Sequence, residues 1–368
     1  MIHSVRSSDS EPLFREPQPA MNDRLIRALR REPLDTTPVW FMRQAGRSLP
    51  KYHELKGDRD LLEVTRDPAL SAEITMLPLE YFPVDGAVLY ADISTIFVGA
   101  GLDVTIEKGL GPVLPHPYDT EDRIRSLEPF EPRETLEFVM DTLRILKRRL
   151  DIPVLGFIGA PFTLMTYMVE SPRSKERAGT KAFMWKEPKL WDVLMSYWSE
   201  HLIKFGVAQV EAGASVIQLF DSWAGTLHPA DYRRSVFPYT KRILEGLEAE
   251  GIPTINFATG NPALLPMMAE AGGDVIGLDW RVRIDEAWEI VGADRGVQGN
   301  LDPVSLLAGT DVAIARTAEV LRAVGGRPGH IFNVGHGLLP QTDHNVVRAV
   351  VDYVHSVDLE KLRGEGPG

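Results

Sequence analysis

Two arginines four residues apart lie in the segment MRQAGRSLPKY (42–52), at the end of an apolar run. Arg43 and Arg47 could bind carboxylates, because a planar guanidinium presents two parallel N–H donors to the two carboxylate oxygens. Alternatively, both lie on a solvated loop and pair with some of the 52 acidic residues of the chain. The formal net charge is −12, so positive charge concentrated at one point favours a small polyanionic ligand over a polymer.

A carboxylate, Asp92, comes at the end of the apolar segment LYADI (89–93). A lone buried carboxylate is costly, so we expect it to meet a cation or several N–H donors. The alternative is a structural aspartate that pairs with a neighbouring arginine or caps backbone amides. Asp92 is therefore a candidate for binding positive charge or N–H groups on a ligand.

Tyr167 and Ser222 follow two further apolar runs. Tyr167 lies in GAPFTLMTYMVE (159–170), where it could bind a ligand or be a core aromatic with a satisfied hydroxyl. Ser222 lies in FDSWAG (220–225), which lacks the Gly-x-Ser-x-Gly pattern of a nucleophilic serine. We therefore expect Ser222 to bind through hydrogen bonds and not to act as a nucleophile.

His336 lies between two glycines in FNVGHGLLP (332–340). The glycines could let the backbone approach a ligand and expose amides to an anion. They could equally form a tight turn in which the histidine satisfies its own loop. The segment GNLDP (299–303) has the same ambiguity, since it could bind a phosphate or simply cap a helix through Asp302.

Composition excludes several classes of site and partner. There is no cysteine, so disulfides, thiolate metal sites and a cysteine nucleophile are impossible. The nine histidines show no His-Glu-x-x-His pattern, and the glycines form no phosphate-loop or dinucleotide motif. We expect no metal and no cofactor. The negative charge also argues against nucleic acid or an anionic membrane as a partner.

The elements that must position these side chains are short apolar runs that alternate with helical patterns. Eight runs without strict alternation suit parallel strands covered on both faces: 38–44, 86–93, 153–160, 215–222, 253–260, 274–281, 296–302 and 330–337. Helical patterns cover 133–150, 189–212, 229–250 and 303–324, and helix starts are indicated at Asp67, Asn261 and Asp302, each followed by proline.

This order predicts a single-domain (β/α)₈ TIM barrel over residues 21–360, with a doubly wound sheet as the alternative. The segment 101–115 alternates around two glycines and is expected as a β-hairpin inserted after the second strand. The uncharged stretch 152–169 contains two prolines and two glycines, so we expect a strand, a turn and a helix rather than a membrane span. Residues 1–20 are expected to be a flexible tail, and the protein to be soluble and cytoplasmic.

Taken together, these segments resemble the uroporphyrinogen decarboxylase family. PVWFMRQAGRSLPKY (38–52) resembles its arginine-rich motif and GFIGAPFTLMTYMVE (156–170) its second motif. YADI, FDSWAG, GNLDP and NVGHG match further family segments in the same order, and the resemblance covers about residues 22–358. Two positions depart from the pattern: Lys51 replaces a usual glutamate, and Lys56 stands where some relatives have arginine.

The resemblance implies a (β/α)₈ barrel that forms a homodimer and converts uroporphyrinogen III to coproporphyrinogen III in heme and tetrapyrrole biosynthesis. Four acetate side chains would lose CO₂ without a cofactor, through protonation of each pyrrole. It also implies functional roles for Arg43, Arg47, Asp92, Tyr167, Ser222 and His336. Asp92 would stabilise the cationic intermediate, the two arginines would bind carboxylates, and Tyr167 and His336 would also lie at the catalytic centre.

Two other functions are compatible with a barrel that has a basic mouth. A methyl transferase of the same broad superfamily would need zinc held by histidine and cysteine, and the chain has no cysteine. A tetrapyrrole carrier would bind the same ligand without releasing CO₂. The proton donor is also open between Arg43 and a water held by Asp92 or Arg43, because an arginine is ordinarily a poor acid.

Overall fold

The computed structural model describes residues 22–107, 109–170 and 174–365. The expected N-terminal tail lies outside these residues. The strands are β1 (Ala87–Val88), β2 (Thr105–Glu107), β3 (Gly111–Val113), β4 (Val154–Gly159), β5 (Val216–Asp221), β6 (Thr254–Ala258), β7 (Val275–Gly277), β8 (Gly296–Gln298) and β9 (His330–Ile331).

The helices of the first half of the chain are short, except for α8. They are α1 (Arg24–Leu29), α2 (Pro50–Lys56), α3 (Leu61–Thr65), α4 (Pro68–Met76), the 3₁₀ helix η1 (Leu77–Glu80), α5 (Thr95–Gly99), α6 (Glu121–Arg125), α7 (Pro132–Thr135), α8 (Glu137–Arg149) and α9 (Pro161–Met168). The stretch 152–169 is thus a strand and a helix, as expected. No helix among the described residues is long and apolar enough to cross a membrane.

The second half contains the longest helix, α11. Its helices are α10 (Ala178–Lys186), α11 (Pro188–Ala212), η2 (Ala224–Thr226), α12 (Pro229–Ser235), α13 (Phe237–Ala249), η3 (Pro262–Leu264), α14 (Leu265–Ala271), α15 (Ile284–Val291), η4 (Pro303–Leu307), α16 (Thr310–Val324), α17 (His344–Ser356) and α18 (Leu359–Glu365). Asp67, Asn261 and Asp302 cap α4, η3 and η4 as expected.

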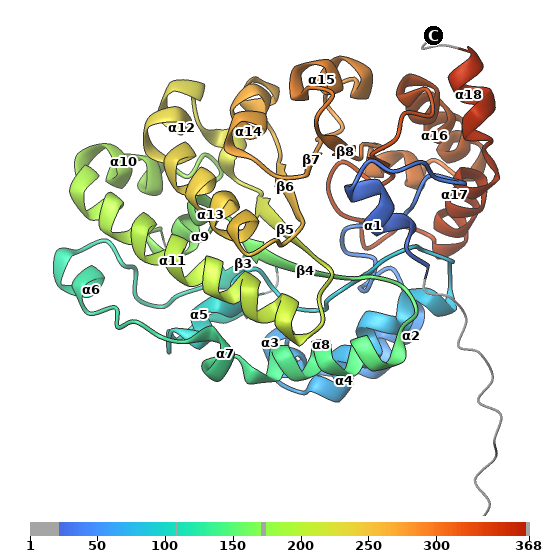
Figure 1. The fold of residues 1–368 in the computed structure, drawn as a ribbon. Helices are drawn as coiled ribbons and strands as arrows, with labels where there is room; N and C mark the ends of the chain where they lie inside the picture. Colours follow the sequence, from blue (N-terminus) through green and yellow to red (C-terminus); the bar gives the residue numbers. More distant parts are fainter. Residues whose placement is uncertain (1–21, 108, 171–173, 366–368) are drawn as a thin grey trace, which may run out of the picture.

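A curled sheet of seven parallel strands forms the centre, in the order β1-β4-β5-β6-β7-β8-β9. Every residue of β4 and β6 is buried, which agrees with strands covered on both faces. Helices lie around the outside of the sheet, and α4, α8, α11, α13, α14, α15, α16 and α17 pack against one another in that order (Figure 1). The chain is therefore an α/β protein with a TIM-barrel-like arrangement.

The first expected strand, 38–44, is wrong as a full strand. Only Val39 forms a bridge, to Phe332. The Val39 N–H donates to the side chain of Asp85, 2.8 Å away, and Arg43 turns the chain with φ +62°. These two features prevent regular strand pairing on either side of Val39.

The segment 38–41 nevertheless lies between the two edges of the sheet. The Phe332 N–H donates to the Pro38 carbonyl at 2.8 Å, and the Asp85 N–H donates to the Val39 carbonyl at 2.7 Å. Inside the sheet, the Trp40 indole donates to Gln298, and Gln298 donates to Gln218. This buried chain of hydrogen bonds ties the segment to β8 and β5.

The segment 101–115 contains β2 and β3, which pair antiparallel between Thr105 and Val113. Three expected helices are each divided in two. The range 229–250 breaks at Val236, because Pro238 follows and cannot donate a helical hydrogen bond. The ranges 133–150 and 303–324 break at Leu136 and Ala308. The breaks shorten the helices without changing their place around the sheet.

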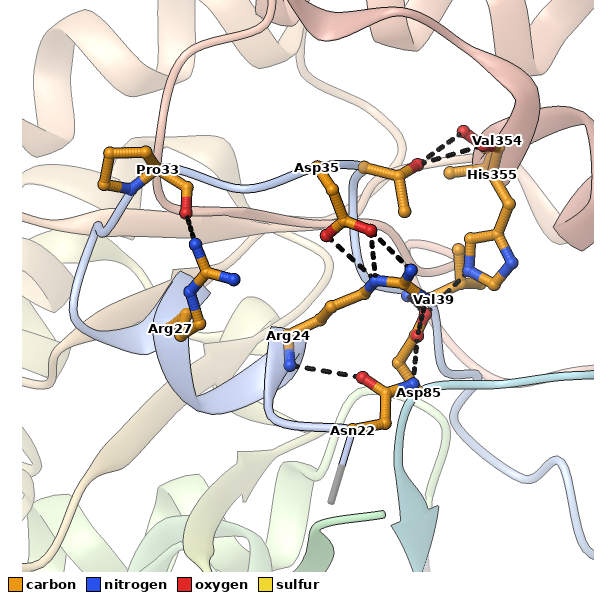
Figure 2. A network of polar contacts seen from close by, with 10 residues as sticks. Asn22, Arg24, Arg27, Pro33, Asp35, Val39, Asp85, Val354 and His355 are labelled. Atoms are coloured by element: carbon orange, nitrogen blue, oxygen red, sulfur yellow. Dashed lines mark hydrogen bonds and ion pairs between the residues drawn. The ribbon is translucent and has the colours of Figure 1, made fainter. Parts of the chain in front are cut away.

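Asp85 joins three segments of the chain (Figure 2). It comes just before β1, so it lies at the amino ends of the parallel strands, away from the predicted site residues at their carboxyl ends. Its buried carboxylate accepts hydrogen bonds from Asn22 at 2.8 Å, from the Val39 N–H at 2.8 Å and from His355 at 2.8 Å. Arg24 forms an ion pair with it at 3.3 Å. The network holds α1, the segment 38–41 and α17 together.

Candidate active site

The polar residues predicted from the sequence lie where parallel strands end. Asp92 comes four residues after β1, Tyr167 lies in the helix that follows β4, Ser222 directly follows β5 and His336 follows β9. Parallel strands of one sheet have their carboxyl ends on one side, so these side chains share that side of the molecule.

The turn that carries Arg43 is held by side-chain amides. Gln44 accepts from the Phe41 N–H at 2.9 Å and donates to the Gly86 carbonyl at 3.0 Å. Asn333 accepts from the Met42 N–H at 3.1 Å. A left-handed φ in a non-glycine residue is costly and persists only where its surroundings hold it. The backbone of Arg43 is thus fixed by contacts to Gly86, just before β1, and to Asn333, just after β9.

Arg43 lies among the other predicted residues. Its side chain is exposed to solvent, yet burial among surrounding protein atoms and the charge of Arg47 lower the pKa of Arg43. Asp92 and Tyr167 act on the same pKa in the opposite direction. We refer to Arg43, Arg47, Asp92, Tyr167 and His336 as the strand-end cluster.

Asp92 is half-buried, so the expectation of a buried carboxylate is wrong. Its Oδ1 accepts from the Ser94 N–H at 2.8 Å and from the Ser94 hydroxyl at 2.5 Å. No hydrogen bond joins Oδ2 to the described residues. The backbone before it is fixed, since Tyr90 is hydrogen-bonded to Ser71 and Thr75 of α4. One oxygen therefore shapes the turn, and the other is available to a ligand.

Tyr167 is positioned by an aromatic and a cationic residue. The Trp223 indole donates to the Tyr167 hydroxyl at 3.1 Å. The guanidinium of Arg177 stacks on the Trp223 ring, 3.5 Å from its centre, and is buried. Glu170 organises the segment that carries Arg177, because it accepts from Ser174 and Thr180. Tyr167 is buried, as a core aromatic would be, and its hydroxyl has a defined partner.

His336 is neutral at neutral pH. Burial, then the nearby charge of Arg43, lowers the pKa of His336 to about 4. The glycines on either side are required by packing: a Cβ at Gly337 would lie 2.5 Å from Cδ of Arg43, and one at Gly335 would clash with the backbone nitrogen of Trp280. The two glycines therefore bring His336 against Arg43 and Trp280.

Ser222 is half-buried and follows a fully buried carboxyl group. Burial raises the pKa of Asp221 to about 6. Asp221 accepts from the Thr163 hydroxyl at 2.6 Å, and its second oxygen has no hydrogen-bond partner among the described residues. Thr163 also accepts from the Trp223 N–H, so the two residues fix the turn around Ser222.

Other polar residues at the strand ends serve the fold. The Asn300 amide donates to the carbonyls of Asp279 and Val282, and Asp302 caps η4 through the Val304 N–H at 2.9 Å. GNLDP thus acts as a helix cap. The two lysines that depart from the family pattern have partners outside the predicted site residues. Lys51 forms an ion pair with Glu80 at 2.8 Å, and Lys56 donates to a nearby backbone carbonyl.

The residues after β7 were not among the predicted site residues. Asp279, Trp280 and Arg281 follow this strand, and Trp280 meets the ring of His336 edge-on at 6.2 Å. Arg281 and Asp279 both act on the pKa of His336. The signal was present as DWR at the end of the run 274–281, the same position relative to a strand that singled out Asp92.

A family model matches this sequence. The model for uroporphyrinogen decarboxylase (URO-D) covers residues 20–357. Proteins named uroporphyrinogen decarboxylase are 48% identical in Sorangium cellulosum and 43% identical in Chloroflexus aggregans. These alignments cover 94% and 92% of this chain and 99% and 97% of the relatives.

Solved structures share the fold at lower identity. A methyltransferase from Methanosarcina mazei has a TM-score of 0.74 at 21% identity, covering 91% of this chain and 98% of that chain. A B12-independent methionine synthase from Shewanella sp. W3-18-1 has a TM-score of 0.52 at 13% identity, covering 81% and 89%. At such identities the similarity concerns the fold alone.

Proposed function

The chain belongs to the uroporphyrinogen decarboxylase family, and from this membership we propose that it converts uroporphyrinogen III to coproporphyrinogen III. Each of four acetate side chains becomes a methyl group and releases CO₂. The strand-end cluster is the proposed site. The observation that carries the proposal is that two arginines and one carboxylate gather on the carboxyl side of the sheet in a chain of net charge −12.

The substrate has eight carboxylates and four pyrrole N–H groups, and the cluster offers a partner for both. Arg43 and Arg47 bind peripheral carboxylates through paired N–H donors. Tyr167, Ser222 and the neutral His336 bind others by hydrogen bonds. The free oxygen of Asp92 accepts the central N–H groups. A polyanion is thus bound at its edge by cations and at its centre by one anion.

The reaction needs an acceptor for the electrons of the broken C–C bond. A proton added to the pyrrole carbon next to the acetate makes the ring cationic. Loss of CO₂ returns the bond electrons to the ring and leaves an exocyclic methylene. A second proton converts the methylene to methyl, and the ring carbon releases the first. Each turnover of one acetate therefore consumes one proton and needs no electron acceptor outside the substrate.

Asp92 stabilises the cationic ring, because a fixed carboxylate at the pyrrole nitrogens favours the charged intermediate over the neutral substrate. Two donors suit the first protonation. Arg43 is one, since burial and Arg47 lower its pKa. A water between Arg43 and Asp92 is the other. Either donor would lie beside Asp92, the carboxylate that stabilises the cationic pyrrole formed in this step.

The test is incubation with uroporphyrinogen III under anaerobic conditions with a chelator, followed by counting the carboxylates of the product. We expect four carboxylates after complete reaction. Asp92→Asn should keep the fold and lower kcat by about a hundredfold or more. The matched control is Asp103→Asn, since Asp103 is exposed. Binding without release of CO₂ would indicate a carrier, and a near-normal rate in Asp92→Asn would remove Asp92 from the mechanism.

The proposal extends to architecture and assembly. Hydrogen bonds from the segment 38–41 to Phe332 and Asp85 support a closed (β/α)₈ barrel as a single domain over 21–360, with 105–113 as its inserted hairpin. The homodimer rests on the family resemblance, and we also propose the cytoplasmic location expected from the sequence. Sedimentation at micromolar concentration tests the dimer, and a mass of one chain would contradict it.

A further inference from the structure

Asp279 collects donors from three directions at the end of β7. Its Oδ2 accepts from the Gly260 N–H at 2.7 Å and from the Thr259 hydroxyl at 2.5 Å. Its Oδ1 accepts from the Arg281 N–H at 2.9 Å. Only 7% of Asp279 is exposed. Both oxygens of Asp279 therefore have hydrogen-bond donors from the backbone or a hydroxyl, in addition to the guanidinium of Arg281.

Arg281 is held in place but keeps donors to offer. Its Nη1 lies 2.6 Å and 2.9 Å from the two oxygens of Asp279, and its guanidinium carbon stacks 3.8 Å from the centre of the Trp280 ring. Its side chain is 46% exposed, and its Nε and Nη2 have no hydrogen bond to the described residues. A guanidinium fixed on one edge and open on the other loses little entropy when it binds a carboxylate.

The arrangement places Arg281 next to the strand-end cluster. Trp280, on which Arg281 stacks, contacts the ring of His336 edge-on, at an interplanar angle of 87°. Gly337, next to His336, packs against the side chain of Arg43. Arg281 and Arg43 are both close enough to His336 to lower its pKa, and Arg281 comes from the β7 side of the site.

We infer that Arg281 is a third carboxylate-binding arginine of the site, which holds a peripheral carboxylate of the tetrapyrrole at the end of β7. The inference rests on the proposed function and adds a residue to it. A ring with carboxylates on its whole circumference needs cations on more than one side. Asp279 and Trp280 position the guanidinium for this contact.

Two measurements test the inference. The first is the KM and kcat of Arg281→Gln with uroporphyrinogen III. The second is the Kd for uroporphyrin, an aromatic octacarboxylate that does not react, followed by fluorescence. We expect KM and Kd to rise about tenfold, the effect of one charged hydrogen bond, with kcat within about twofold of wild type. Arg281→Lys should show a smaller rise, because it keeps the charge and loses the fork and the stacking.

The matched control is Arg283→Gln. Arg283 is two residues away and 62% exposed, and it pairs with Asp285 at 2.6 Å and with Glu286 at 3.1 Å. It should have wild-type KM and Kd. Wild-type KM and Kd in Arg281→Gln would overturn the inference, whether or not the Tm is lower. Arg281 would then only stabilise the position of Asp279. Binding of uroporphyrin that depends on Arg281, without release of CO₂ by wild type, would refute the proposed function alone.

Discussion

Close packing around Arg43 restricts the neighbouring position 337 to glycine. The side chain of Arg43 occupies the space that a Cβ at position 337 would need. A Gly337→Ala change would therefore push against the stem of a proposed substrate-binding residue. The same holds for Gly335 and the backbone of Trp280. The glycines of GHG thus allow His336 to lie close to both Arg43 and Trp280.

The buried carboxyl group of Asp221 makes stability depend on pH. Burial raises the pKa of Asp221 from 3.8 to about 6. The unfolded chain therefore loses this proton first, and the folded state loses stability as pH rises from about 4 to about 6. Asp221→Asn removes the charge and keeps an oxygen for the Thr163 hydroxyl. We expect the variant to be more stable than wild type at pH 8 by about 3 kcal/mol, at about 1.36 kcal/mol per pKa unit.

Chemical unfolding of both proteins between pH 4 and pH 8 checks this expectation. The difference between their free energies of unfolding isolates Asp221, because all other titrating groups are common to both proteins. It should grow from pH 4 to pH 6 and then stay constant. A variant that is less stable than wild type at pH 8 would contradict the assignment and indicate that the charged form is stabilised in the folded state.

Single residues differed in how far the sequence revealed their surroundings. Asp92 and His336 could be selected because each follows an apolar run, and they do lie beyond strand ends, whereas Tyr167 lies in the helix after β4. The partners of Tyr167 could not be selected. Trp223 is 56 positions away in the chain, and the position of Arg177 depends on the hydrogen bonds that join Ser174 and Thr180 to Glu170. Such contacts are set by tertiary packing and leave no local pattern.

Elements were easier to predict than their limits. Seven expected strands contain the observed strands β1 and β4 to β9, because a buried parallel strand leaves a continuous apolar run. The run 38–44 has the same composition but forms only a bridge. Its N–H partner is the side chain of Asp85, and a side chain that replaces a strand partner cannot be recognised from periodicity. The helix division at Val236 was foreseeable from Pro238.

Asp85 joins three elements, so its loss should destabilise the whole fold. Burial alone would raise the pKa of Asp85, but the hydrogen bond and charge of His355 and the donors Asn22 and Val39 lower it below 3.8. Asp85→Asn should lower the free energy of unfolding at pH 7 by about 3 kcal/mol, because it leaves the partly buried donors of Arg24 and His355 without an anion. Thermal and urea unfolding measure this loss.

Asp35→Asn is the matched control, since Asp35 binds the same Arg24 at 2.5 Å but is 56% exposed. It should cost less than about 1 kcal/mol. The stabilisation from Asp85 is present above its unfolded pKa and is lost as pH falls through its lower folded pKa. The gap between wild type and Asp85→Asn should therefore close below about pH 4. An equal cost for the two variants at pH 7 would show that the network does not join the elements.

The net charge of the molecule and the arginines of its site act on an anionic ligand in opposite directions, and the salt dependence of binding can tell which effect is larger. The chain carries a net charge of −12 and should repel a ligand with eight carboxylates at long range. The arginines of the strand-end cluster attract the same ligand at short range. Salt weakens both effects, but it screens distant charges more than partly buried pairs, and the Debye length falls from about 30 Å at 0.01 M to about 8 Å at 0.15 M.

We expect attraction by the cluster to dominate, because Arg43 is partly desolvated and has Arg47 nearby, whereas the 52 acidic residues are spread over the chain. KM for uroporphyrinogen III should then rise several-fold between about 0.01 M and about 0.15 M salt, while kcat changes little. Steady-state kinetics with a non-binding salt measure both. A KM that falls with salt would mean that the net charge governs approach, and that the cluster acts only after the ligand has arrived.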